Sequence, residues 1–446
     1  MDTQQPNEKH TEGDFGHKPK TALLTLDLLK PNPANPRKHT RAQIRAIARS
    51  IEAFGFNAPI LVDRNRQIIA GHGRYEAAKL AGYTQVPVIF LDHLTETQAR
   101  AYMLADNKLT DRSTWDDSKI AIHLKELTDL ALDFDIEAIG FELPEIDIRI
   151  QSLDQTDAAD RADEFDLASE PAVSVAGDLW ILGPHRLRCG SALENGAYSD
   201  LFDNEKATAA FTDPPYNVAI DGHVSGNGRI THREFPMATG EMSEVEFTEF
   251  LTASLSLICA HTVAGALVYM CMDWRHMVEM HAAGSSSGCD LLNLCVWSKS
   301  NGGLGSLYRS RHELIFVFRN GKEAHLNNIQ LGRFGRNRTN VWNYPSVNTF
   351  ARKGSNLHPT VKPILMVADA IQDSTRRNDI VLDPFLGSGT TLLAAERTNR
   401  RCYGVELDPL YVDTAIERWQ RMSGRKAHSR LGETFDLIKA KRTATP

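Results

Sequence analysis

The second half of the chain alternates short apolar runs with helical segments, and this alternation restricts the fold more than any other feature. Between the runs lie segments with apolar residues at three- and four-residue steps, or polar loops. Strands that alternate with helices predict an α/β protein with a mainly parallel sheet, in which ligands bind beyond the carboxyl ends of the strands. The strands that we expect are 186–189, 207–212, 266–272, 291–297, 313–318, 379–382 and 402–406.

Composition excludes several other classes of protein. Apolar residues make up 42% of the chain and charged residues 24%, as in soluble globular proteins and unlike fibrous or wholly disordered chains. The six cysteines form no Cys-x-x-Cys pair, so we expect neither a disulfide framework nor a zinc module, which favours a reducing cytoplasm. The first twenty residues are polar and show no export signal.

An uncharged stretch at 251–272 could be a membrane span or two elements of a soluble domain. Polar residues interrupt it, and Ser243 with Glu246 forms the sequence pattern of a capping box at the start of a helix. We therefore expect a helix from about Ser243, followed by a buried strand, and no contact with a membrane.

An acidic segment at 154–170 divides the chain. Seven acidic residues lie there among Ala, Ser and Gln, a composition typical of a solvated linker. We therefore expect a disordered tail at 1–20, a smaller α+β domain at 21–150, an acidic linker at 151–176 and a larger domain at 177–446. In the smaller domain we expect helices at 40–54, 71–82 and 95–107, and strands at 59–63, 67–70 and 86–91.

The first motif that carries chemistry is Asp213-Pro214-Pro215-Tyr216, directly after the run 207–212. The exocyclic amine of a nucleobase is a poor nucleophile because its lone pair is delocalised into the ring. An enzyme must therefore accept its hydrogens and hold the nitrogen in line with an electrophile. Asp213 and the Pro214 carbonyl can accept them, the prolines fix the backbone, and Tyr216 offers a ring face to a flipped base. Alone, the tetrapeptide is also compatible with a stiff turn.

The second motif is the segment 382–391, Leu-Asp-Pro-Phe-Leu-Gly-Ser-Gly-Thr-Thr, between an expected strand and a helix. Its glycines allow a ligand to approach the backbone. Glu406 ends the next strand, seventeen residues after Gly389, at about the spacing where an acidic side chain reaches ribose hydroxyls. A single Gly-x-Gly could be a tight turn, but strand, glycine loop, helix, strand and terminal acid together predict a nucleoside-binding site.

With both motifs in this order, residues 177–436 resemble the β class of S-adenosylmethionine-dependent DNA amino-methyltransferases, whose Rossmann-like sheet is circularly permuted. The segments 296–299, 308–313 and 358–363 also match that class. The resemblance implies S-adenosylmethionine as cofactor. It implies catalysis by Asp213, Pro214, Pro215 and Tyr216, and cofactor binding by Asp383, Phe385, Gly387, Gly389, Thr390, Glu406 and Lys362. Where the family often has Cys-Gly-Asp, this chain has Cys189-Gly190-Ser191, so recognition of the cofactor adenine is weaker or comes from elsewhere.

The resemblance implies direct methyl transfer to the N6 amine of a flipped adenine in duplex DNA, without a covalent enzyme intermediate or a metal, as in restriction-modification. Aspartate at the first position of the tetrapeptide favours adenine N6, and N4 of cytosine stays open as an alternative. Cytosine-C5 methylation is disfavoured because the chain has no Pro-Cys pair. Two other classes also stay open: a non-catalytic ParB-like DNA-binding protein with a decayed methyltransferase half, and a methyltransferase that acts on RNA or protein.

The segment 299–362 is strongly basic. It carries eleven basic and two acidic residues, a balance of +9, whereas the whole chain carries −7 and the rest of it therefore −16. A basic surface on an acidic molecule is typical of a protein that meets a polyanion, although a solvated basic face is the alternative. In the family the target-recognition region lies here, at about 300–360. The candidates for contact with duplex DNA are Arg309, Arg311, Arg333, Arg336 and Arg338.

Residues 23–110 resemble the ParB-like domain that also underlies sulfiredoxins. Asn35-Pro36-Arg37 and the segment 71–78, which opens with Gly71-His72-Gly73-Arg74, carry the resemblance. A helix that a glycine opens, with an arginine beside it, can hold a phosphate, so Arg37, Gly71, His72 and Arg74 form a candidate phosphate or nucleotide site. Partition proteins usually have Gly-Glu-Arg-Arg here and sulfiredoxins a cysteine, and a structural role for His72 and Arg74 is equally compatible. The family also leaves a homodimer open.

Overall fold

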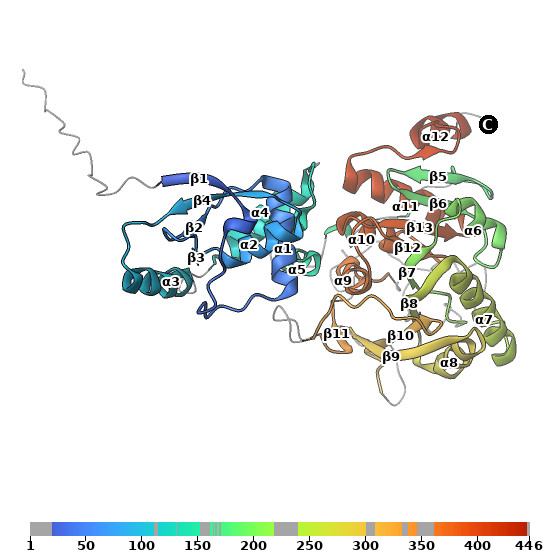
Figure 1. Ribbon diagram of the computed structural model, residues 1–446. Coiled ribbons are helices and arrows are strands. Elements are labelled where there is room, and N and C mark those ends of the chain that lie inside the picture. The colour runs from blue at the N-terminus through green and yellow to red at the C-terminus, as the bar shows by residue number, and fades with distance from the viewer. Residues whose placement is uncertain are drawn as a thin grey trace, which may run out of the picture. The chain divides into compact units, whose positions relative to one another are not determined.

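The computed structural model describes residues 20–110, 115–130, 132–151, 161–163, 165, 167–168, 171–217, 240–299, 308–331, 338–345 and 361–443. The chain divides into two compact units, Met1–Gln155 and Thr156–Pro446 (Figure 1). Within those described ranges, no helix is both long and apolar enough to cross a membrane.

The first unit is built on a four-stranded sheet with the order β1-β4-β2-β3. β4 is antiparallel to β1 and parallel to β2, and β3 is antiparallel to β2. The strands are β1 (Lys20–Thr25), β2 (Ile60–Val62), β3 (Ile68–Ala70) and β4 (Gln85–Phe90). The helices are η1 (Leu26–Leu28), α1 (Arg41–Phe54), α2 (His72–Leu80), α3 (Glu96–Thr110), α4 (Asp117–Asp129), η2 (Ile136–Ile139) and α5 (Leu143–Gln151).

The local sequence explains where the helices of this unit begin and end. The Thr40 hydroxyl accepts a 3.2 Å hydrogen bond from the Gln43 amide and starts α1, and Gly55 ends it with a φ of +84°. At the start of α3, Thr95 and Gln98 each accept the other's backbone amide, at 3.3 and 2.9 Å, in the expected capping box. The helices predicted at 40–54 and from 95 are therefore present.

The second unit is built on a ten-stranded sheet with the order β11-β9-β10-β8-β7-β12-β13-β6-β5-β14. Strands β8, β7, β12, β13 and β6 form a parallel block, and an antiparallel strand follows on each side. The predicted α/β class is confirmed, but the sheet is mixed, with a central parallel block and antiparallel pairings on both sides of it. The strands are β5 (Leu179–Leu182), β6 (His185–Cys189), β7 (Ala207–Thr212), β8 (Thr262–Met272), β9 (Cys289–Ser298), β10 (His312–Asn320), β11 (Val341–Asn343), β12 (Ile380–Asp383), β13 (Arg401–Glu406) and β14 (His428–Ser429).

Helices cover both faces of this sheet, with α6, α7 and α8 on one face and α9, α10 and α11 on the other (Figure 1). Each face has its own buried apolar cluster, which includes Trp297 and Trp419 on the α9–α11 face and Phe247 and Phe316 on the other. The helices are η3 (Arg161–Asp163), α6 (Asn195–Phe202), α7 (Glu244–His261), η4 (Trp274–His276), α8 (Met277–Ser286), α9 (Ile364–Ser374), α10 (Thr390–Arg397), α11 (Pro409–Ser423) and α12 (Phe435–Thr443).

The second part of the predicted acidic linker differs from the expectation of a solvated segment. Phe165 is buried, with the Arg418 guanidinium 3.9 Å from its ring centroid. The backbone amides of Val173 and Ser174, both buried, donate to the Asp413 carboxylate at 2.5 and 2.9 Å. One aromatic ring and these amides therefore attach the segment to the second unit, a contact that acidic composition alone does not reveal.

Candidate active site

The two sequence motifs meet at the carboxyl edge of the large sheet. β7 and β12 are parallel neighbours, and they end at Thr212 and Asp383. The Thr212 hydroxyl donates a 2.7 Å hydrogen bond to Asp383 Oδ1, and both side chains are buried. The Asp-Pro-Pro-Tyr tetrapeptide and the glycine loop therefore leave the sheet from residues that are bonded to each other.

The side chains of the tetrapeptide turn toward one another. The Tyr216 hydroxyl donates to Asp213 Oδ1 at 2.5 Å, and Lys362 Nζ donates to Asp213 Oδ2 at 2.6 Å. Tyr216 is half-buried and packs against the apolar clusters of both sheet faces. Pro214 is buried and Pro215 half-buried, so the backbone between Asp213 and Tyr216 is both enclosed and stiff. The Asp213 carboxylate is consequently held at both of its oxygens.

Lys362, which the resemblance implies in cofactor binding, lies with its ammonium against the tetrapeptide. Its side chain is 4% exposed, and Nζ is 2.9 Å from Glu313 Oε2 and 3.1 Å from the Tyr216 hydroxyl. Glu313, on β10, also accepts a hydrogen bond from Lys299. Sequence reasoning missed Glu313 and Lys299 as site residues. The available signal was the match of the segments 296–299 and 308–313, which end in these two residues, to the methyltransferase class.

Burial and charge act against each other in this cluster. Burial alone would raise the pKa of Glu313, but Lys362 and Lys299 outweigh burial and lower it to about 2. Burial alone would lower the pKa of Lys362, but Asp213 and Glu313 outweigh it and raise that pKa. The pKa of Asp213 is raised, because burial outweighs the attraction of Lys362. At neutral pH the Lys362 ammonium and the Glu313 carboxylate are therefore charged, and Asp213 is the carboxylate that a proton reaches first.

The glycine loop folds around the carboxylate of Glu406. The Gly387 amide donates to Glu406 Oε2 at 2.8 Å, and the Asp408 amide donates to Oε1 at 2.8 Å. Gly389 has a φ of +91°, and a Cβ there would lie 2.9 Å from Ala415 Cβ, so the turn into α10 requires glycine. A Cβ at Gly387 would meet no atom within 4 Å, so this glycine borders open space.

The other predicted cofactor residues lie in or beside the same loop. Phe385 is half-buried, and its ring centroid is 5.9 Å from that of Phe250 on α7. Thr390 is the first residue of α10 and is half-buried. Cys189-Gly190-Ser191 follows the adjacent strand β6, and the Gly190 amide donates to the Glu406 carbonyl at 2.9 Å. Three neighbouring strand ends thus converge on the loop.

Two carboxylates of this loop have raised pKa values. Burial raises the pKa of Glu406 to about 7, against the opposing effect of its two amide donors. Burial also raises the pKa of Asp383 to about 6, against hydrogen bonds from Thr391, Thr212 and the Phe385 amide. Glu406 therefore titrates near physiological pH. A ligand whose hydroxyls donate hydrogen bonds to this side chain would favour the ionised carboxylate.

The predicted DNA-contacting arginines fall into three groups. Arg309 and Arg311 lie just before β10, and the Arg311 carbonyl accepts a 2.9 Å hydrogen bond from the Lys299 amide, beside the cluster of Asp213, Glu313 and Lys362. The Arg311 side chain is exposed. Arg333 and Arg336 lie outside the described residues, as does the segment 358–360.

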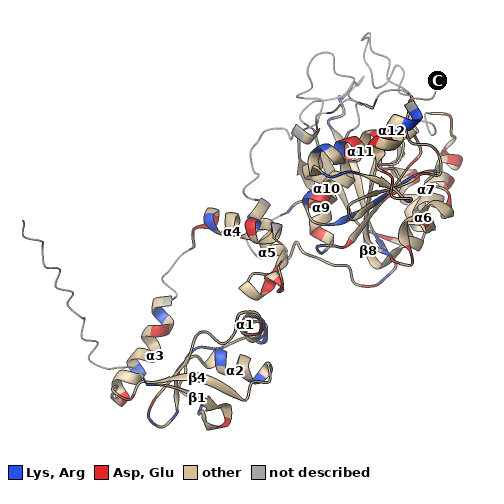
Figure 2. Ribbon diagram, turned by 90° about the horizontal axis from the view of Figure 1, so that it is seen from above, with Lys and Arg blue, Asp and Glu red and all other residues tan. Residues whose placement is uncertain are grey.

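Arg338 forms the third group, because it is already paired within the protein. It donates to Asp369 at 2.7 Å and pairs with Asp373 at 2.8 Å, both buried carboxylates on α9. Its side chain therefore joins the segment before β11 to α9. Figure 2 shows basic and acidic residues interspersed along the helices of this unit.

In the first unit, the structure brings Gly71, His72 and Arg74 together at the start of α2. Gly71 opens the helix with a φ of +99°. His72 Nε2 accepts a 3.2 Å hydrogen bond from the Asn32 amide, and burial, followed by His39, lowers the pKa of His72. Arg74 donates at 3.1 Å to the carbonyl that precedes β2. Arg37 instead donates at 3.2 Å to a side chain of α3.

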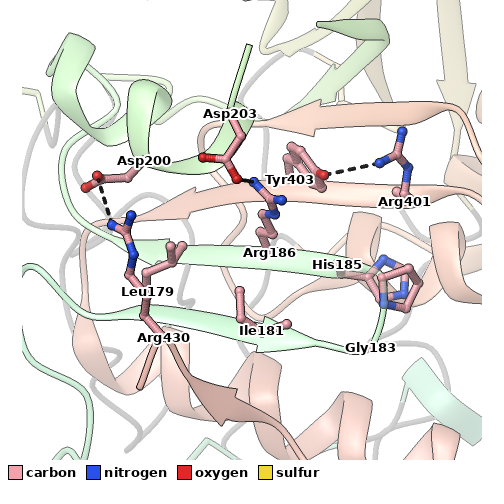
Figure 3. Close-up of a pocket in the computed structure, with 11 residues that line it drawn as sticks. Leu179, Ile181, Gly183, His185, Arg186, Asp200, Asp203, Arg401, Tyr403 and Arg430 are labelled. Atoms are coloured by element: carbon pink, nitrogen blue, oxygen red, sulfur yellow. Dashed lines mark hydrogen bonds and ion pairs between the residues drawn. The ribbon is translucent and has the colours of Figure 1, made fainter. Parts of the chain in front are cut away.

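A pocket of about 510 Å³ lies at the opposite, amino end of the parallel strands (Figure 3). It is lined by the first residues of β6 and β13, by β5 and by the end of α6. Its three arginines each face a carboxylate: Arg186 with Asp203 at 2.7 Å, Arg401 with Glu205 at 2.9 Å and Arg430 with Asp200 at 3.6 Å. These charges balance, and none of the predicted site residues lines this pocket.

Metal-ligating side chains do not gather anywhere in the described ranges: no group of three or more His, Cys, Asp or Glu is arranged to hold a metal ion there.

Two protein families match this chain. Residues 207–417 match the DNA methylase family, and residues 10–108 match the ParB N-terminal domain. The Type II methyltransferase M2.DpnII of Streptococcus pneumoniae is 28% identical over 222 residues, which are 48% of this chain and 82% of that protein. The Type II methyltransferase M2.MboI of Moraxella bovis is 23% identical over 233 residues, 50% of this chain and 84% of that protein.

Solved structures give weaker likenesses. The complex of M1.HpyAVI with SAM is 20% identical and covers 52% of this chain and 97% of that chain, with a TM-score of 0.39. A ParB protein of Caulobacter crescentus in complex with CTP-gamma-S is 23% identical and covers 31% of this chain and 81% of that chain, with a TM-score of 0.28. The two family matches, each on its own unit, show that the chain joins a ParB N-terminal domain to an enzyme domain of the N6/N4 DNA methylase family.

Proposed function

We propose that this DNA methyltransferase moves a methyl group from S-adenosylmethionine to the N6 amine of a flipped adenine in duplex DNA. The observation that carries the proposal is the 2.7 Å bond between Thr212 and Asp383, because it fixes the base-binding tetrapeptide and the nucleoside loop at one sheet edge. Relatives that are named Type II methyltransferases support the same reaction.

The residues around the glycine loop fit a bound S-adenosylmethionine. Gly387 borders open space, and Gly389 lets the loop backbone pack closely against α11. Glu406 presents a buried carboxylate to which ribose hydroxyls can donate. Phe385 supplies an apolar wall, and Asp383 and Thr390 flank the loop on either side. The cofactor supplies a sulfonium methyl group, an electrophile that needs no further activation.

The tetrapeptide then acts on the amine. Asp213 and the Pro214 carbonyl accept the two amine hydrogens, and the face of Tyr216 stacks on the flipped base. Bound S-adenosylmethionine would supply the methyl carbon to the amine nitrogen, and its sulfur would keep the electron pair of the broken carbon–sulfur bond. The nitrogen must lose one proton, and the Asp213 carboxylate, whose pKa is raised, is placed to receive it.

The wider contacts of the protein follow from the basic residues of each unit. Arg309 and Arg311, beside the catalytic cluster, contact DNA phosphates or base edges, and Arg333 and Arg336 belong to the same basic segment. At the first unit, the start of α2 with Gly71, His72 and Arg74 binds a nucleotide phosphate, the class of ligand that the Caulobacter ParB protein holds in its complex with CTP-gamma-S. The enzyme works in the cytoplasm. It works as a monomer or as a homodimer.

The experiment that tests the proposed function is transfer of a tritiated methyl group from S-adenosylmethionine to plasmid DNA, followed by digestion to nucleosides. The label should appear in N6-methyl-deoxyadenosine, and Asp213→Ala should remove it. Label in N4-methyl-deoxycytidine would overturn the choice of adenine. Transfer to RNA or polypeptide in preference to duplex DNA would overturn the choice of substrate. Binding of S-adenosylmethionine without any transfer would favour the non-catalytic alternative.

A further inference from the structure

We propose that Glu313, braced by Lys299, is a positioning residue that anchors the Lys362 ammonium against Asp213, so that one fixed cation sets both the orientation and the charge of the catalytic carboxylate. The inference rests on the proposed function, since it assigns roles in that reaction to two residues that neither motif contains.

Several oxygens of the described residues surround Lys362 Nζ. An ammonium has three N–H groups, and three oxygens lie within hydrogen-bond distance: Asp213 Oδ2 at 2.6 Å, Glu313 Oε2 at 2.9 Å and the Tyr216 hydroxyl at 3.1 Å. The three acceptors come from the end of β7 and from β10, so the ammonium joins segments that are about a hundred residues apart in sequence. A displacement of Nζ would break at least one of the three contacts.

Burial makes this arrangement stiff. Lys362 is 4% exposed and Glu313 9% exposed, so neither charge can exchange its partner for water at low cost. One carboxylate would be enough to neutralise Lys362. The second carboxylate, Glu313, gives the ammonium a further fixed partner besides Asp213. Lys299 pairs with the other oxygen of Glu313, so the cluster contains two cations and two carboxylates.

An aromatic ring completes the support around the ammonium groups. Lys299 Nζ lies 4.8 Å and Lys362 Nζ 5.9 Å from the ring centroid of Trp297, which is buried on β9. The Trp297 indole N–H donates at 2.9 Å to the Tyr344 carbonyl, and this bond fixes the plane of the ring. Both lysines therefore have an attractive aromatic surface nearby.

This network determines what Asp213 can do for a substrate. Oδ1 is held by the Tyr216 hydroxyl and Oδ2 by Lys362, and a carboxylate has further lone pairs with which it can accept an amine hydrogen. The other titratable groups that face Asp213 are the Glu313 carboxylate, the Cys271 thiol and the Asp383 carboxylate. Lys362 is thus the cation in direct contact that lowers the pKa of Asp213, and Glu313 is the anion that raises this pKa while it holds that cation in place.

Two substitutions should therefore move the acid limb of the pH–rate profile in opposite directions. In Lys362→Met the cation that contacts Asp213 is lost, so the pKa of Asp213 rises and the acid limb of the pH–rate profile moves upward, by about one to three pH units. In Glu313→Gln the opposing anion is lost while the shape of the side chain is kept, so the acid limb moves downward. The rate at neutral pH should fall about 100-fold or more in Lys362→Met and about 10-fold in Glu313→Gln.

The experiment measures single-turnover methyl transfer to duplex DNA as a function of pH for the wild-type chain, both variants, Lys362→Arg and the control Lys206→Met. Lys206 is an exposed lysine just before β7, outside both the cluster and the basic segment 299–362, and its variant should match the wild type. Lys362→Arg, which keeps the charge, should leave the acid limb closer to the wild-type position than Lys362→Met does. S-adenosylmethionine affinity and thermal melting show whether each variant is folded.

Opposite displacements of the acid limb support the positioning role, because a merely structural defect would lower the rate without moving the two limbs in opposite directions. Displacement in the same direction, or no displacement in either variant, overturns it. These results differ from a failure of the proposed function itself, in which the wild-type chain would transfer no methyl group at any pH.

Discussion

The hydroxyl of Thr212 donates a 2.7 Å hydrogen bond to the carboxylate of Asp383, and this bond ties the last residues of two parallel strands together. One strand leads into the base-binding tetrapeptide and the other into the nucleoside loop. In an open α/β sheet, ligands bind beyond the carboxyl ends of the strands, and in the proposed reaction this bond would hold the two ligand-binding segments at a fixed separation. Small errors in such a distance cost reaction rate, because the reacting atoms must approach closely.

Thr212→Val should weaken both the fold and the reaction. Valine keeps the shape but removes the donor, so the buried Asp383 carboxylate loses a partner, and the free energy of unfolding should fall by about 1–3 kcal/mol. Thr208→Val is the matched control, since its hydroxyl, at the other end of β7, donates at 3.2 Å to the Ile380 carbonyl. Urea unfolding measures the stability of both variants. Methyl-transfer assays should show a rate loss for Thr212→Val only. Equal rate losses in both variants would contradict a specific role for this bond.

The affinity for S-adenosylmethionine should weaken as pH falls below about 7. Burial raises the pKa of Glu406 from its ordinary value of 4.5 to about 7, and ribose hydroxyls donate best to the ionised carboxylate. Binding at pH 6 should therefore release protons, which calorimetry in buffers of different ionisation enthalpy measures. Glu406→Gln should bind weakly and release fewer protons, with Asp383, whose pKa is about 6, accounting for the rest. Proton uptake by the wild-type chain would contradict the assignment.

The same raised pKa affects the stability of the protein without ligand. Between pH 4.5 and about 7 the unfolded chain loses the Glu406 proton while the folded chain keeps it. The contribution of this group to stability therefore falls as pH rises through that interval. Glu406→Gln should show a smaller fall over the same range in urea unfolding experiments.

Gly389→Ala should destabilise the cofactor loop by more than the cost of a positive φ, because the added Cβ would also clash with a neighbouring helix. Its φ is +91°, and the added Cβ would lie 2.9 Å from Ala415 Cβ. Gly424→Ala is the matched control, since Gly424 ends α11 with a φ of +70° and a Cβ there would meet no atom within 4 Å. The control should lose about 1 kcal/mol of stability and keep its affinity for S-adenosylmethionine. Gly389→Ala should lose more stability and most of that affinity, and equal effects of the two substitutions would contradict a packing requirement in the loop.

The arginines of the basic segment should separate into structural and DNA-contacting residues. Arg338→Met leaves the buried carboxylates of Asp369 and Asp373 without this partner, so the free energy of unfolding should fall by about 3 kcal/mol. Arg311→Met should leave stability unchanged, weaken DNA binding and reduce the slope of log affinity against log salt by about one. Titrations at several salt concentrations, together with thermal melts, check both. A stability loss in Arg311→Met with an unchanged salt slope would reverse the assignment.

Much of the fold follows from local signals in the sequence. The capping box of Ser243 and Glu246 places the start of α7, and apolar runs place β7, β12 and β13 within one residue of their observed ends. Caps and strand periodicity depend on neighbours a few residues away, so they are readable in the chain itself.

Contacts between distant segments are what the sequence left undetermined. Glu313 and Lys299 join the site because β10 and β9 bring them to Lys362. The segments that end in these residues match the methyltransferase class, but that match does not show which residue they contact. Arg338 was predicted to contact DNA because it lies in a basic segment. In the structure it is paired instead with the acidic side chains of α9. Charge patterns along a chain do not show which charges fold against one another.

The most direct test of the central claim separates binding of the methyl donor from chemistry at the amine. Asp213→Asn keeps the shape of the side chain but removes the carboxylate that accepts the amine hydrogen. Its affinity for S-adenosylmethionine should stay within about twofold of the wild-type value, because the glycine loop and Glu406 are intact. Its single-turnover rate of N6-methyladenine formation in duplex DNA should fall by about 100-fold or more. A wild-type rate in Asp213→Asn would contradict the account.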